Sequence, residues 1–148
     1  MRAFFPSRLS SRIRDLLVQD NGPLRTEELN VSVSRLDYKG RHILRADYRG
    51  CKTEEAMVSV LDDLIREVET APRAVLILSD FTDSAVGSSF MSKGKTFGKQ
   101  YDAKIAKSAM LGVAGMKEIL LRAFLAFTGS RTTRTFPTEA EALDWLAE

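Results

Sequence analysis

Apolar and polar residues follow one period before residue 31 and another after it. In residues 7–19 the apolar side chains recur at three- and four-residue spacing, which is typical of one face of a short helix: Leu9, Ile13, Leu16 and Leu17. Asp20–Pro23 ends this helix, because Asn-Gly favours a turn and proline cannot continue a helix. We therefore predict one domain over residues 31–148 and an N-terminal helical extension over residues 1–30. The extension either packs on the domain or forms a basic arm that docks on a partner or a membrane surface.

The domain is predicted to begin with a hairpin and a helix. Alternating apolar and polar positions at 31–35 and 43–48 predict two strands, and the glycine-containing turn at 38–41 joins them as an antiparallel hairpin. Thr53 can cap a helix that ends at Ala71. The predicted core-facing stripe of this helix contains Ala56, Val60, Leu61, Leu64, Ile65 and Val68.

Strands and helices alternate through the remainder of the chain. The continuous apolar run at 74–78 indicates a strand that is covered on both faces of a sheet. Further helices are predicted at 88–102, 116–127 and from Thr138, and further strands at 106–113 and 132–136. The predicted inner stripe of the helix at 116–127 is Met116, Ile119, Leu120, Ala123, Phe124 and Phe127. Such alternation predicts an α/β fold with a mixed, mainly parallel sheet of about five strands and about four helices.

The composition narrows the class of function. The chain has 148 residues with 22 basic and 20 acidic side chains, and a net charge this small does not argue for nucleic-acid binding, so we expect none. No apolar run is long enough to cross a bilayer, and the N-terminus lacks a hydrophobic signal core. The single cysteine fits a reducing compartment. We therefore expect a cytoplasmic protein that is not transmembrane.

The residue types that build common catalytic sites are scarce. His42 is the only imidazole and Cys51 the only thiol, so the sequence predicts no metal site, no cofactor and no enzymatic activity. A Cys51–His42 dyad is the one catalytic hypothesis that these residues allow.

Glycines mark three further positions. Gly112–Lys117 lies between a strand and a helix, where backbone amides can hold an anion, but it lacks the spacing of a nucleotide-binding loop, and a tight turn is the simpler interpretation. Gly94 and Gly98 fall inside a predicted helix. They indicate either the close approach of another backbone or a poorly ordered helix.

The end of the chain carries the most distinctive motif. Residues 136–146, Phe-Pro-Thr-Glu-Ala-Glu-Ala-Leu-Asp-Trp-Leu, are similar to the ending of the SpoIIAA-like branch of the STAS superfamily, a branch of stand-alone bacterial proteins. The predicted element order and the apolar strand at 105–113 also resemble this branch. The resemblance implies a STAS fold and a non-enzymatic regulatory role with a protein partner.

The resemblance also indicates a phosphorylation site. STAS regulators carry the phosphorylated serine after the central strand, in an Asp-Ser-Ser-Gly sequence. Here Asp83-Ser84 matches the first pair, whereas Ala85-Val86 departs from the second. The phosphoacceptor candidate is therefore Ser84. The alternative is that Ser84, Ser88 and Ser89 cap the following helix.

Two surfaces are candidates for binding. The helix at 88–102 combines lysines with aromatic residues, and the basic residues continue in Lys104 and Lys107. This pattern suits an acidic or phosphorylated partner or an anionic headgroup, or else it is a solvated face over a packed stripe. The predicted partner-binding residues are Asp83, Ser84, Ser88, Ser89, Lys93, Lys95, Phe97 and Lys99. The helix at 116–127 is apolar on both sides and must be covered by a second copy, the N-terminal arm or an apolar ligand. The predicted ligand-lining residues are Phe90, Phe97, Leu121, Phe124 and Leu125.

Two functional hypotheses follow. The first is a non-enzymatic regulatory module of the STAS type that binds a protein partner, with a homodimer as one arrangement. The second is a carrier or sensor of a small apolar ligand or lipid, because the SpoIIAA-like branch looks similar in fold to CRAL-TRIO lipid-transfer domains.

Overall fold

The computed structural model describes residues 32–148, and the predicted helical extension over residues 1–30 lies outside them. The strands are β1 (Val33–Tyr38), β2 (Arg41–Asp47), β3 (Val75–Asp80), β4 (Ile105–Leu111) and β5 (Thr133–Phe136). The α-helices are α3 (Glu54–Thr70), α4 (Ser88–Gln100), α5 (Met116–Thr128) and α6 (Glu139–Ala147), and the short 3-10 helix η1 (Asp102–Lys104) follows α4. The predicted order of strands and α-helices is confirmed.

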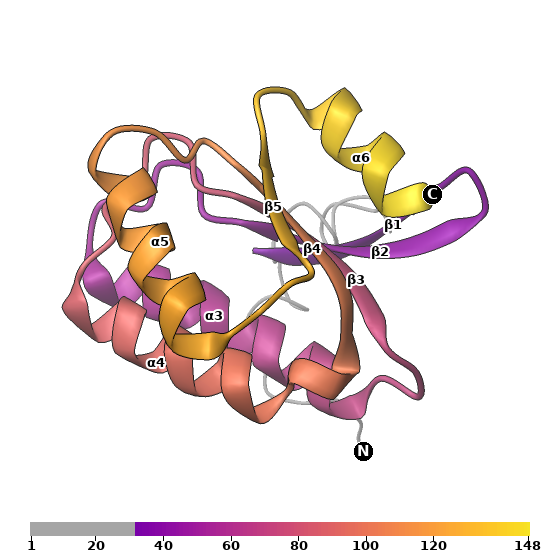
Figure 1. Cartoon of the computed structure of the whole chain (residues 1–148), viewed down its shortest axis with the longest axis horizontal. Helices are drawn as coiled ribbons and strands as arrows, with labels where there is room; N and C mark the ends of the chain where they lie inside the picture. Colours follow the sequence, from indigo (N-terminus) through magenta and orange to yellow (C-terminus); the bar gives the residue numbers. More distant parts are fainter. Residues whose placement is uncertain (1–31) are drawn as a thin grey trace, which may run out of the picture. The chain divides into compact units, whose positions relative to one another are not determined.

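The strands form one sheet in the order β1-β2-β3-β4-β5. Among the strands of residues 32–148, only β1 and β2 pair in antiparallel fashion, and the other neighbours are parallel, as predicted. Each parallel connection moves one strand further in the same direction, so right-handed crossovers place α3, α4 and α5 on one face. Figure 1 shows these three helices together on one side of the sheet and α6 on the other.

The sheet therefore has a core on each face, and β3 contributes to both. Ile77 packs in the core beneath α3 and α4, and Leu78 packs in the core beneath α6. Both side chains are almost completely inaccessible to solvent. The prediction that the run at 74–78 is a strand covered on both faces is confirmed.

Two helix starts are set by local sequence. Thr53 Oγ1 accepts a hydrogen bond from Ala56 N at the start of α3, and Thr138 Oγ1 accepts one from Glu141 N at the start of α6. The buried stripe of α3 contains Val60, Leu61, Leu64 and Val68 as predicted, and Met57 joins them. Ile65 is partly buried and packs against this core, as predicted, whereas Ala56 is not among the buried residues.

Only part of the predicted inner stripe of helix α5 faces inward. Met116, Ile119 and Phe127 were predicted to face inward, and they are 69%, 57% and 52% exposed. Leu120 and Phe124, which belong to the same predicted stripe, do line the cavity, and Leu121 lines it as well. The prediction was wrong for Met116, Ile119 and Phe127 because apolar residues surround most of this helix, so its periodicity defines no single inner face. None of its residues is fully buried.

No helix within residues 32–148 combines the length and the hydropathy that a bilayer-spanning segment needs.

Candidate functional site

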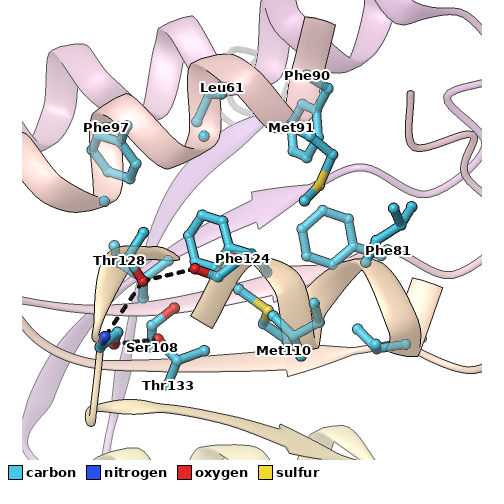
Figure 2. A pocket seen from close by; sticks show the side chains of 18 of the residues that line it. Leu61, Phe81, Phe90, Met91, Phe97, Ser108, Met110, Phe124, Thr128 and Thr133 are labelled. Atoms are coloured by element: carbon cyan, nitrogen blue, oxygen red, sulfur yellow. Dashed lines mark hydrogen bonds between the residues drawn. The ribbon is translucent and has the colours of Figure 1, made fainter. Parts of the chain in front are cut away.

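A cavity of about 120 Å³ lies between the sheet and helices α4 and α5. Strands β3 and β4 supply its floor, through residues such as Ile77, Ser108 and Met110. Phe90, Met91 and Phe97 of α4 and Phe124 of α5 form its walls, as Figure 2 shows. The lining is predominantly apolar, which is the usual character of a small-molecule site.

Two glycines of α4 make room for α5. A Cβ atom at Gly98 would lie 3.2 Å from Phe124 Cζ and 3.2 Å from Thr128 Cγ2, and one at Gly94 would lie 3.7 Å from Phe124 Cε1. Both glycines line the cavity. A side chain of α5 therefore approaches them, which corrects the expectation of another backbone or a poorly ordered helix.

One end of the cavity is aromatic. Tyr48 stacks on Phe81 with ring centroids 4.5 Å apart, and both rings meet Phe90 edge-on at 5.4 and 6.0 Å. These separations fall within the favourable range for aromatic pairs. The three rings build a rigid apolar wall where β2 and β3 end.

The opposite end is polar. Thr128, Ser130 and Thr133 lie there around Ser108, and Figure 2 shows Ser108, Thr128 and Thr133 grouped away from Phe81 and Phe90. The Ser130 and Thr133 hydroxyls are 3.0 Å apart, and Thr128 Oγ1 donates to Phe124 O at 3.1 Å. The flanking hydroxyls thus already have partners.

Three buried hydroxyl groups in the cavity have no such partner. Tyr48, Ser79 and Ser108 are 1%, 4% and 8% exposed and line the cavity, and their hydroxyls form no hydrogen bond with any residue among 32–148. Burial raises the pKa of Tyr48 well above its ordinary value, and the neighbouring Cys51 adds to this. Buried hydroxyls without partners are uncommon, because losing water without gaining another bond is costly.

The predicted ligand-lining residues largely meet at this cavity. Phe90, Phe97, Leu121 and Phe124 line it, whereas Leu125 is not among its lining residues. The sequence did not predict the residues of the cavity floor. Which side chains of a strand face a cavity depends on which face of the sheet the helices cover. The signal was present in Ser79 and Ser108, two polar residues within apolar strands.

The loop between β3 and α4, where the phosphoacceptor was predicted, is held by hydrogen bonds. Ser84 Oγ donates to Phe81 O at 2.7 Å, and Ser84 is half-buried. Asp83, with φ of 57°, pairs with Lys52 Nζ at 2.5 Å, and this contact lowers the pKa of the Asp83 carboxyl. The loop is also joined to residues 50 and 51 through backbone hydrogen bonds.

The start of α4 is capped by an acidic residue of another helix. Glu54 Oε2, from α3, accepts hydrogen bonds from Ser89 N at 2.8 Å and Phe90 N at 3.5 Å. The capping position is Gly87, without a side-chain cap, so the alternative that Ser84, Ser88 and Ser89 cap this helix was wrong. The carboxylate of Glu54 occupies the place where those serines were expected to act.

The residues of the predicted basic surface contact different parts of the protein. Lys93 pairs with Asp62 of α3 at 2.5 Å. Lys104 Nζ donates to Ala71 O and Lys107 Nζ to Trp145 O, where each satisfies a carbonyl at a helix end. Phe97 lines the cavity.

Lys95 and Lys99 lie beside the same aromatic ring. Their Nζ atoms lie 5.4 and 5.1 Å from the ring centroid of the exposed Phe127 of α5. About 16 Å of helix separates Lys99 from Ser88, so Lys99 lies well away from the loop serines.

The structure does not bring the candidate catalytic pair together. His42 lies at the first end of β2, where it is 88% exposed and contacts Asp37, and Cys51 lies beyond the other end. About 16 Å of strand intervenes. Burial, together with Asp47, raises the pKa of the Cys51 thiol, which opposes thiolate formation. Within residues 32–148 no group of three His, Cys, Asp or Glu side chains could hold a metal ion.

Comparison with known proteins establishes the fold. No protein-family model matches the chain, and no curated protein matches it. A solved structure that does match is an uncharacterised protein from the DUF3478 family with a SpoIIAA-like fold, from Shewanella loihica PV-4. The TM-score is 0.61 at 18% sequence identity, over 79% of this chain and 96% of the other. The chain therefore has a SpoIIAA-like fold, which confirms the fold that the resemblance in its sequence implied.

Proposed function

We propose that this chain is a non-enzymatic ligand-binding module that holds a small apolar molecule between its sheet and helices α4 and α5. The cavity carries the proposal, since apolar side chains of α4, α5, β3 and β4 converge on one space. Burying apolar ligand surface against such walls is favourable at about 25 cal/mol per Å².

The packing of α5 supports the same function. No residue of α5 is fully buried, whereas five residues of α3 are. A weakly held helix over an apolar cavity can move aside to admit a ligand and close on it afterwards.

Native mass spectrometry of protein purified from the cells that make it tests the proposal. We expect the chain to carry an additional mass that is released on denaturation. Gly94→Leu, which places a side chain toward the cavity and Phe124, should abolish this mass. Ser92→Leu on an exposed face of the same helix should retain it. A bare chain in the wild type would remove the main support for a ligand carrier.

A protein partner with acidic side chains is a second candidate, favoured by one observation. Lys95 and Lys99 flank the ring of Phe127, which is 52% exposed. An aromatic side chain surrounded by cations suits a partner that offers an apolar pocket with acidic residues at its rim.

Charge reversal tests this second function. We expect Lys95→Glu with Lys99→Glu to release a specific protein that the wild type retains in a cross-linked pull-down. Arg73→Glu, an exposed charge elsewhere, should leave capture unchanged. Retention of the same protein by the double variant would contradict the assignment.

A further inference from the structure

The cavity contains information about the ligand beyond its apolar character. Ser108, on β4, is 8% exposed, and its hydroxyl has no hydrogen-bond partner among residues 32–148. In the sheet, Ser108 is paired with Thr133 of β5 and Ile77 of β3. Its side chain therefore stands on the cavity floor, at the end where the lining is richest in hydroxyls.

The other two unpartnered hydroxyls differ in their surroundings. Tyr48 is covered by the rings of Phe81 and Phe90, so its position is at the aromatic end. Ser79 lies on β3, where it pairs with Met110 of β4. It follows Ile77 on the same face of the strand and is nearer to the aromatic end. Ser108 is the unpartnered hydroxyl that adjoins Thr128, Ser130 and Thr133, as Figure 2 shows for Thr128 and Thr133.

We propose that the ligand is a neutral molecule with a ring-sized apolar body and one hydroxyl or carbonyl group that hydrogen-bonds to Ser108. This inference rests on the proposed ligand-binding function and adds the chemical class of the ligand. The apolar body lies toward Phe81 and Phe90, and the polar group lies toward the hydroxyl-rich end. A ligand in this orientation gives Ser108 the partner that the protein itself does not supply.

The size of the cavity and the charges of its lining define the class of ligand further. The cavity, at about 120 Å³, is of the order of cavities known to hold a single benzene ring. The phenyl rings of Phe90, Phe97 and Phe124 are suited to a flat aromatic body. The two charged lining residues, Asp102 and Lys117, have opposite signs, and Lys117 Nζ already donates to Phe81 O at 3.0 Å. An unpaired ion in an apolar site is strongly disfavoured, which favours a neutral ligand.

Matched probes test the inference on the full chain. Toluene and p-cresol differ by one hydroxyl, and amide chemical-shift titration by NMR gives the affinity of each. We expect p-cresol to bind about tenfold more tightly than toluene, the effect of one neutral hydrogen bond in a desolvated site. Ser108→Ala should lower the affinity for p-cresol to that for toluene. Ser79→Ala, the same substitution on the neighbouring strand, should preserve the preference for p-cresol.

Each alternative outcome identifies which statement fails. If both probes bind equally, the apolar site stands and the role of Ser108 is wrong. If Ser79→Ala loses the preference for p-cresol while Ser108→Ala keeps it, the proposed position of the ligand's polar group is wrong. If 4-methylbenzoate binds as tightly as p-cresol, the ligand class is not neutral. If neither toluene nor p-cresol binds, the proposed ligand-binding function fails with the inference.

Discussion

At the scale of single residues, several charged side chains act at the ends of helices. Glu54 accepts hydrogen bonds from the first amides of α4, and Lys104 and Lys107 donate to carbonyls at the ends of α3 and α6. Helix ends leave backbone groups without partners inside the helix, and charged groups of the appropriate sign satisfy them well. The sequence suggested that the lysines form a binding surface. It could not show that some of them reach the ends of other helices.

Glu54→Ala should destabilise the protein by about 1–2 kcal/mol, because α4 loses the carboxylate that caps it and two amides lose an acceptor. Equilibrium unfolding in urea measures the change. Glu55→Ala is the matched control, since Glu55 is exposed in the same turn of α3. Equal unfolding midpoints for the two variants would show that Glu54 has no capping role.

The Cys51 thiol should react slowly with an alkylating reagent. Burial and the nearby Asp47 raise its pKa, so at neutral pH the reactive thiolate is scarcer than in an ordinary cysteine. The pH profile of iodoacetamide alkylation in the folded chain should have its midpoint above the ordinary thiol value of about 8.5. The urea-unfolded chain provides the reference. A folded-state midpoint below that of the unfolded chain would contradict the raised pKa and would support a catalytic role for Cys51.

At the scale of elements, the contact between α4 and α5 depends on two glycines one turn apart. Gly98 is closely approached by Phe124 and Thr128, and Gly94 has more space. Glycine weakens a helix in its interior, by about 1 kcal/mol relative to alanine, so its use here trades helix stability for close packing and for the cavity.

Gly94→Ala and Gly98→Ala should therefore differ. The new methyl group at position 94 makes an ordinary contact at 3.7 Å, so we expect a gain of about 0.5–1 kcal/mol from helix propensity. At position 98 the contacts of 3.2 Å require Phe124 and Thr128 to move, and this variant should be at least about 1 kcal/mol less stable than the first. Thermal unfolding compares the pair. Identical stabilities would mean that α5 adjusts freely to α4.

At the scale of the whole described domain, the two faces of the sheet are covered unequally. On one face α3 buries five residues, while its neighbour α5 buries none. On the other face α6 buries Ala142 and Leu146 and is joined to β2 by the ion pair between Arg45 and Glu139 at 2.8 Å. The cavity therefore lies beneath the α-helix that has no fully buried residue among those described.

Amide hydrogen exchange should reflect this difference. We expect amides of α5 to exchange on the order of tenfold or more faster than those of α3, because opening α5 exposes less buried apolar surface. A bound ligand should slow exchange in α5 selectively. Mass spectrometry after timed exchange measures both helices in one experiment. Equal protection of α3 and α5 would contradict the view of α5 as a movable cover.

The sequence by itself determined the order of the elements and the fold class. Alternation at period two and recurrence at three and four residues report local geometry, and Thr53 and Thr138 act within their own helix turns. The closing motif, together with the element order, also identified the SpoIIAA-like fold that the comparison established. Four of the five predicted ligand-lining residues line the cavity, because large apolar residues on α4 and on α5 face each other across it.

Tertiary structure alone decided the phase of α5, the cap on α4 and the polar end of the cavity. An evenly apolar helix has no preferred inner face until it meets the sheet, so Met116 and Phe127 could not be recognised as exposed from the sequence. Glu54 lies 35 positions before Ser89, and Ser108 lies 25 positions before Thr133, so no local period connects these pairs. Strand register and helix crossing bring them together, and both depend on the packing of the whole domain.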